Sequence, residues 1–304
     1  MIEKSQKYSE EELAIGIVYK DLRIAKGFSQ SEAAGNEIST THLSNFENGK
    51  TILSTHRFFN ILQNINVNLF EFQNSLNQYL QEKDLLLFNM EMANALVEKN
   101  ISKLRTIVDK LQKKIELDST SCTTKKYKLD YIRTKSILSF IDSSYSLTKN
   151  EISFIENYLY NIKEWGQYDI ALLGQCAQFF DWIHLMELTD RMISPSQNSS
   201  NIPYIKQAII QTVLNIINVF IDAGLYTPVR KFIKYLENND IHDYYMFEKL
   251  TLVYNTAYYN YKRGDENALD MMKECQKVLE FCNCFKTSDW VATEISNIET
   301  LKNR

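Results

Sequence analysis

The sequence predicts an all-α protein, and its composition carries most of that prediction. Only 8 Gly and 3 Pro occur among 304 residues, and no proline precedes Pro195. Strands and hairpins need turn residues at short intervals, so this scarcity favours long helices joined by short polar turns. Hydrophobic residues make up 44% of the chain and charged residues 24%, a balance that allows a buried core.

Capping patterns predict five short helices within the first 72 residues. A small polar residue followed three positions later by Glu marks a helix start, because each side chain caps the other's backbone N–H. Such pairs predict helices after Ser9, Ser29 and Asn68, and Ser39 and Ser54 open two more. We therefore predict that residues 1–72 form one small domain.

The helices lengthen from Leu76 onward, and the breaks between them are short and polar. Helical periodicity is present in residues 76–100, 101–117, 125–142, 151–164, 169–184, 204–223, 226–237, 246–263, 265–282 and 286–302. No strict 34-residue repeat emerges, but the helix lengths suit a solenoid of degenerate helix-turn-helix repeats over residues 73–304.

Charge, cysteine content and hydropathy indicate a cytoplasmic protein that is not globally basic. The net charge is −4, and residues 1–72 carry 7 Lys/Arg against 9 Asp/Glu, so any nucleic-acid contact must come from a local patch. The N-terminus is too polar for a signal peptide, and five cysteines form no disulfide framework. The most apolar stretch, AIIQTVLNIINVFI, is interrupted by polar residues and is expected to be too short to cross a membrane.

The stretch ISTTHLSNFENGK, residues 38–50, predicts a helix with an uncharged exposed face. Leu43 and Phe46 would bury one side, and Gly49 would end the helix in a left-handed conformation. The remaining face holds Ser39, Thr40, Thr41, His42 and Asn45. Hydroxyls and carboxamides can bond base edges and phosphates, so the pattern favours a helix-turn-helix module with this helix in the major groove.

The segments KDLRIAKGFSQSEAA and ISTTHLSNFENGK together resemble the phage-repressor-like (XRE) class of helix-turn-helix proteins. The resemblance implies that Arg23 pairs with Glu47 and joins the first helix to the third. It also places Thr40, Thr41 and Asn45 at base-contacting positions. Gln30 and Ser39 lie at phosphate-contacting positions, and Lys50 lies in the loop that contacts the DNA backbone.

The rest of the chain resembles the Rgg/GadR/MutR branch of the peptide-responsive (RRNPP) regulators. The segment LTKNEISFIENYLYNIKEWGQYDIALLGQ is the most specific part, and VLNIINVF and YNTAYYNYKRGDENAL follow it. The resemblance implies a right-handed, TPR-like repeat domain that binds a short secreted and reimported peptide, as in quorum sensing. It further implies a homodimeric transcription regulator, with RNA polymerase left open as a further partner.

Three polar stripes at helical spacing are candidates for holding a peptide backbone. They comprise Gln211, Asn215, Asn218 and Asp222; Thr251, Asn255, Tyr258 and Lys262; and Gln175, Gln178 and Trp182. Carboxamides offer both a donor and an acceptor to an extended peptide. The alternative interpretation is that each stripe is the hydrated edge of a packed helix.

Other site classes have weaker support in the sequence. The four histidines are scattered, and Cys275, Cys282 and Cys284 have no histidine to complete a zinc site, so they are interpreted as ordinary thiols with a redox role left open. No catalytic constellation stands out, and we expect neither an enzyme nor a cofactor. The apolar final helices, residues 265–302, are the predicted homodimer interface. The competing function is a helical-repeat interaction scaffold whose N-terminal module mediates assembly.

Overall fold

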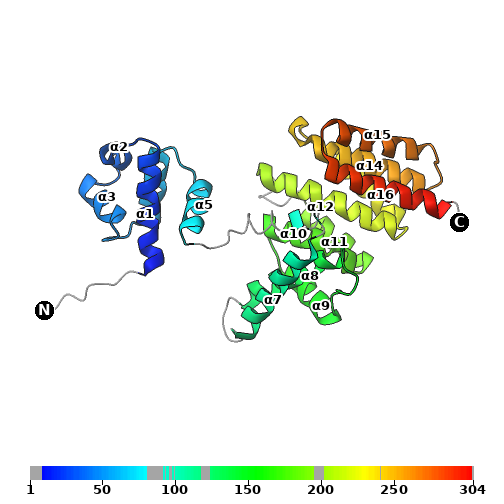
Figure 1. Cartoon of the computed structure of the whole chain (residues 1–304), viewed down its shortest axis with the longest axis horizontal. Helices are drawn as coiled ribbons and strands as arrows, with labels where there is room; N and C mark the ends of the chain where they lie inside the picture. Colours follow the sequence, from blue (N-terminus) through cyan, green and yellow to red (C-terminus); the bar gives the residue numbers. More distant parts are fainter. Residues whose placement is uncertain are drawn as a thin grey trace. The chain divides into compact units, whose positions relative to one another are not determined.

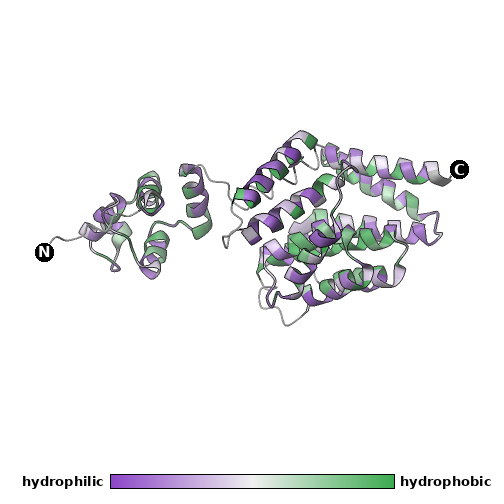
Figure 2. Ribbon diagram, turned by 90° about the horizontal axis from the view of Figure 1, so that it is seen from below, coloured by the Kyte–Doolittle hydropathy of each residue, from purple (hydrophilic) through white to green (hydrophobic). Residues whose placement is uncertain are grey.

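The computed structural model describes residues 9–80, 92, 94–95, 98, 100–117, 124–194, 202–239 and 241–302, and within these it is all-α (Figure 1). The chain divides into two compact units, Met1–Glu91 and Met92–Arg304. Each unit has its own hydrophobic core. Most helices carry both hydrophobic and hydrophilic residues along their length, as expected of amphipathic helices (Figure 2).

The first unit is built from five short helices around one core. They are α1 (Glu10–Ala25), α2 (Gln30–Ala34), α3 (Thr40–Glu47), α4 (Thr55–Asn64) and α5 (Leu69–Tyr79). The predicted capping boxes at Ser9, Ser29 and Asn68 are all formed, each with the Glu three residues later. The predicted domain boundary between residues 72 and 73 falls inside α5, because this helix packs on α1 and continues to Tyr79.

The described helices of the second unit follow one another as a repeat. They are α7 (Ile101–Leu117), α8 (Thr124–Ser139), α9 (Lys149–Tyr160), α10 (Gln167–Cys176), α11 (Trp182–Met192), α12 (Pro203–Asp222), α13 (Tyr226–Asn238), α14 (Met246–Lys262), α15 (Ala268–Phe281) and α16 (Phe285–Lys302), with short 3-10 turns η1 (Ala177–Phe179) and η3 (Asp243–Tyr245). In Figure 1 the α7–α9 group lies at one end of this unit and the α14–α16 group at the other.

The even-numbered helices α8, α10, α12, α14 and α16 form a parallel row. Hydrogen bonds join neighbouring members at residues between 36 and 42 positions apart, and in the pairs α8–α10 and α12–α14 the partner numbers rise together along both helices. The repeat therefore has a period near 40 residues, longer than the roughly 34 of regular TPR repeats. This explains why no 34-residue repeat is visible in the sequence.

One sequence-based expectation about the helices is wrong, and the predicted apolar stretch AIIQTVLNIINVFI lies within a longer helix, α12. The predicted helix 169–184 is broken, because α10 passes into a 3-10 turn and Asp181 then caps a new helix, α11. The apolar helix α12 is 20 residues long, which by length and composition alone is enough to cross a membrane. It is a core helix of this unit, however, and 56% of its apolar window is buried there.

Candidate nucleic-acid and ligand interfaces

Helix α3 is held against α1 by a buried ion pair. Arg23 Nε donates to Glu47 Oε1 at 2.5 Å and Arg23 Nη2 to Glu47 Oε2 at 2.9 Å, a bidentate arrangement. Both residues are buried, and Arg23 Nη1 donates to the Phe28 carbonyl oxygen at 2.7 Å. The hydrogen bond to Glu47 raises the pKa of Arg23. The predicted pairing of these residues is confirmed.

The backbones of α1 and α3 touch at Gly16, a feature that the sequence analysis missed. A Cβ atom at this position would lie 2.0 Å from the Phe46 carbonyl oxygen, so a glycine is required. Leu43 and Phe46 are buried on the same side of α3, as predicted. Gly49 ends this element with a φ of 67°, the left-handed conformation that glycine adopts readily. Together these contacts fix the face that α3 presents to solvent.

The outer face of α3 carries polar side chains that make no internal hydrogen bonds. Thr40 and Thr41 are exposed, and His42 and Asn45 are half-buried. Within the described chain, none of these four side chains hydrogen-bonds another residue. Lys50, just beyond the helix, is exposed. These groups can bond a partner without first breaking an internal contact.

The remaining predicted DNA contacts are already engaged within the protein. Gln30 Nε2 donates to Glu47 Oε2 at 2.8 Å, which orients the carboxamide and leaves its second N–H for a phosphate. Ser39 Oγ accepts from the His42 backbone N–H at 3.1 Å as the N-cap of α3, and its hydroxyl hydrogen can still donate. Neither residue is therefore free to reorient toward bases.

In the second unit, α12 presents the polar stripe that the sequence predicts. Gln211 and Asn215 are exposed, and Asn218 is half-buried with its Oδ1 lacking a hydrogen-bond partner within the described structure. Gln211 Nε2 donates to Glu248 Oε1 at 2.7 Å. Asp222 accepts from the Tyr258 hydroxyl at 2.7 Å. Both of these bonds link the stripe to α14.

Two residues predicted for the peptide surface do not lie as the sequence stripes imply: Asn255 is buried, whereas Trp182 is exposed but on a different helix. Asn255 is fully buried, and its Nδ2 donates to the Leu214 carbonyl oxygen at 2.9 Å, so it ties α14 to α12 and is closed off from the surface. Its Oδ1 has no partner among the described residues. Trp182 is the first residue of α11 and not a continuation of α10, so it does not share a stripe with Gln175 and Gln178.

Gln175, in α10, and Gln178, in η1, lie beside α8. Gln175 Oε1 accepts from Arg133 Nε, and Gln178 Nε2 donates to Ser139 Oγ at 3.0 Å. Gln178 is exposed and Gln175 half-buried. Both carboxamides therefore help to join two members of the row, and each keeps part of its bonding capacity.

A buried polar cluster around Arg133 was missed by the sequence analysis. The Tyr168 hydroxyl donates to Asp130 Oδ1 at 2.9 Å, and the Arg133 guanidinium lies 5.5 Å from the centre of the Tyr168 ring. Burial raises the pKa of Asp130 and lowers that of Arg133. The signal in the sequence was an Asp and an Arg three residues apart on one helix, a spacing that surface ion pairs share.

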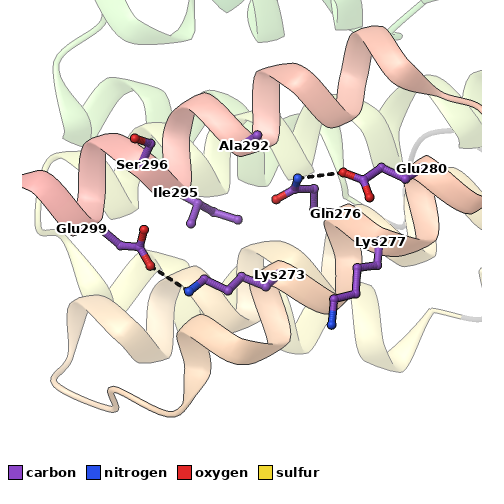
Figure 3. A pocket seen from close by; sticks show the side chains of 8 residues that line it. All are labelled: Lys273, Gln276, Lys277, Glu280, Ala292, Ile295, Ser296 and Glu299. Atoms are coloured by element: carbon purple, nitrogen blue, oxygen red, sulfur yellow. Dashed lines mark hydrogen bonds and ion pairs between the residues drawn. The ribbon is translucent and has the colours of Figure 1, made fainter.

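The last two helices form a surface groove lined by six polar side chains together with Ala292 and Ile295 (Figure 3). Lys273 of α15 pairs with Glu299 of α16 at 2.7 Å across it, and Gln276 bonds Glu280 at 2.9 Å. Of the apolar residues predicted to form a dimer interface here, Met272, Leu279, Val291 and Ile295 are instead buried inside the unit. The exposed ones are Val278, Phe281, Phe285 and Trp290, with Leu269 and Ile298 partly buried.

The described cysteines are free thiols in two different settings. Cys176 is fully buried, and burial raises its pKa to about 12. Burial also raises the pKa of Cys275, whereas Cys282 and Cys284 are exposed. Within the described part of the chain, no three His, Cys, Asp or Glu residues are grouped to hold a metal ion. Cys122 lies outside the described residues.

A helix-turn-helix module joined to a helical-repeat unit defines the class of DNA-binding transcription regulators. Comparison with known families agrees: residues 20–72 match the helix-turn-helix family, and residues 109–290 match the C-terminal domain of the HTH-type transcriptional regulator Rgg. The second match spans more than half of the chain. The chain therefore belongs to the Rgg family of helix-turn-helix transcriptional regulators.

Solved structures share the fold along nearly the whole chain. The SHP pheromone receptor Rgg2 of Streptococcus dysgalactiae is 23% identical, with a TM-score of 0.72 over 93% of this chain and 99% of that one. A protein from Listeria monocytogenes EGD-e has a TM-score of 0.75 at 16% identity, over 95% and 98% of the two chains. The PrgX/cCF10 complex gives 0.66 at 15% identity, over 94% and 99%.

Proposed function

We propose that this regulator acts in the cytoplasm as a homodimer whose DNA binding is controlled by a short, mostly apolar peptide. The observation that carries the proposal is the carboxamide stripe of α12, where Gln211, Asn215 and Asn218 lie among buried apolar residues. Two fold neighbours support it by what they bind: Rgg2 is a pheromone receptor, and PrgX has been solved in complex with cCF10.

The chemistry of the stripe suits an extended peptide. A bound peptide must pair its backbone N–H and C=O groups once water is excluded, and each carboxamide offers a donor and an acceptor. Asn218 Oδ1 is buried without a hydrogen-bond donor among the described residues, so its capacity to accept a hydrogen bond is unused. Gln175 on α10 and Tyr258 on α14 lie on the neighbouring members of the row, and Gln178 lies on the turn η1 after α10; all three are proposed to extend the surface.

Titration calorimetry with a synthetic library of short apolar peptides tests the proposal. Asn215→Ala should weaken the best peptide by about 1–3 kcal/mol, because a buried peptide group loses its partner. Asn157→Ala is the matched control, since Asn157 is an exposed asparagine on α9, outside the row. Equal affinity of both variants would remove the α12 surface from the proposal.

Dimerisation is proposed to use the exposed apolar residues at the turn between α15 and α16. Phe281 is 88% exposed and Phe285 59%, more than a terminal repeat in water would normally leave uncovered. A symmetric dimer would present two α3 helices, which suits an inverted repeat in DNA. If the protein is instead a repeat scaffold without a peptide ligand, it should bind specific protein partners, and calorimetry should detect no binding of any peptide.

A further inference from the structure

The face of α3 that is free to contact DNA lacks the side chains that read guanine best. The helix sequence is TTHLSNFE, with no Lys or Arg between Thr40 and Glu47. Bidentate pairing with guanine O6 and N7 is chiefly the work of Arg or Lys. His42 offers a single ring N–H at a time to a base edge while neutral, which discriminates less than a bidentate pair.

The side chains of α3 that make no internal hydrogen bond are suited to the A·T base pair. A carboxamide such as that of Asn45 pairs in bidentate fashion with adenine N6 and N7, and threonine methyl groups pack on the C5-methyl of thymine. Asn45 makes no side-chain hydrogen bond within the described chain, and Thr40 and Thr41 are exposed in the first turn of the helix. The nearby carboxamide of Asn48 is different, since it donates to the Ser44 carbonyl at 2.7 Å and accepts from Lys20.

Neighbouring cations are placed outside α3. Lys20 Nζ is bonded to Asn48 Oδ1 at 3.3 Å, and Lys50 lies beyond the C-terminal end of the helix. Arg23 is buried and donates to Glu47 and the Phe28 carbonyl. Positive charge near α3 is thus suited to phosphates, which carry no sequence information by themselves.

We infer that α3 selects A·T base pairs, with Asn45 holding an adenine and Thr40 or Thr41 packing on a thymine methyl. The inference rests on the proposed DNA binding through α3. It specifies the base chemistry of the half-site, which the fold alone leaves open.

The test begins with selection of preferred duplexes from a random library by the full-length protein. In the selected duplex, replacing one adenine at a time by 7-deaza-adenine removes only N7, and replacing thymine by deoxyuridine removes only the methyl group. We expect roughly a tenfold loss of affinity at the adenine read by Asn45, measured by fluorescence anisotropy. A smaller loss is expected at the thymine.

Matched protein variants assign the contacts. Asn45→Ala should lose affinity for the selected duplex and become indifferent to the 7-deaza substitution, whereas Lys50→Ala should weaken selected and random duplexes alike. A selected core of G·C pairs, or a duplex indifferent to every base analogue, would overturn the inference while leaving DNA binding intact. Failure to select any sequence would instead count against DNA reading by α3 itself.

Discussion

Removing the carboxylate of Glu47 should lower the free energy of unfolding of the first unit more than removing an exposed side chain does. Glu47 is 1% exposed and accepts from Arg23 twice and from Gln30 once. Glu47→Ala would leave the Arg23 guanidinium buried with only the Phe28 carbonyl as a hydrogen-bond partner among the described residues. Breaking one side of a buried pair costs about 3–5 kcal/mol, so the unit should lose that much free energy of unfolding.

Hydrogen exchange measured by mass spectrometry on the full chain resolves this loss by segment. Amides of α1 and α3 should exchange faster in Glu47→Ala, while those of α12 should not change. Lys20→Ala is the control in the same unit, because the Lys20–Asn48 contact is exposed and should contribute less than about 1 kcal/mol. The reasoning would be refuted if alanine substitutions at Arg23 and at Glu47 each left the stability and the hydrogen exchange of the first unit unchanged.

Three further predictions concern packing, pH and assembly. Gly16→Ala should destabilise the first unit by about 1–3 kcal/mol in chemical unfolding, because the new methyl group collides with the Phe46 carbonyl. Burial raises the pKa of Glu294 to about 7, so its protonated form is favoured in the folded state. Stability of the second unit should therefore fall as pH rises from about 4.5 to 7, and Glu294→Gln should flatten that dependence in thermal unfolding. Phe281→Ser with Phe285→Ser should give monomers by light scattering, and an unchanged dimer would place the interface elsewhere.

Local signals allowed much of the first unit to be predicted from the sequence. A capping box involves residues only three positions apart, so its chemistry is legible without tertiary information. The Arg23–Glu47 pair followed from a resemblance and not from spacing. The requirement for Gly16 could not be read in the same way, since it depends on how closely two helices cross.

Asn215 and Asn255 show why the ligand surface was harder to predict than the fold. Both are asparagines in the middle of a helix with apolar neighbours, and sequence alone treats them alike. The packing of α14 against α12 separates them: Asn215 stays exposed, whereas Asn255 is enclosed and donates to Leu214. Substituting Asn255 by Ala should therefore lower stability by roughly 1–3 kcal/mol, because a buried bond is lost and a cavity is left. Peptide affinity measured by calorimetry on the folded variant should stay unchanged, and a selective loss of affinity with normal stability would return Asn255 to the ligand surface.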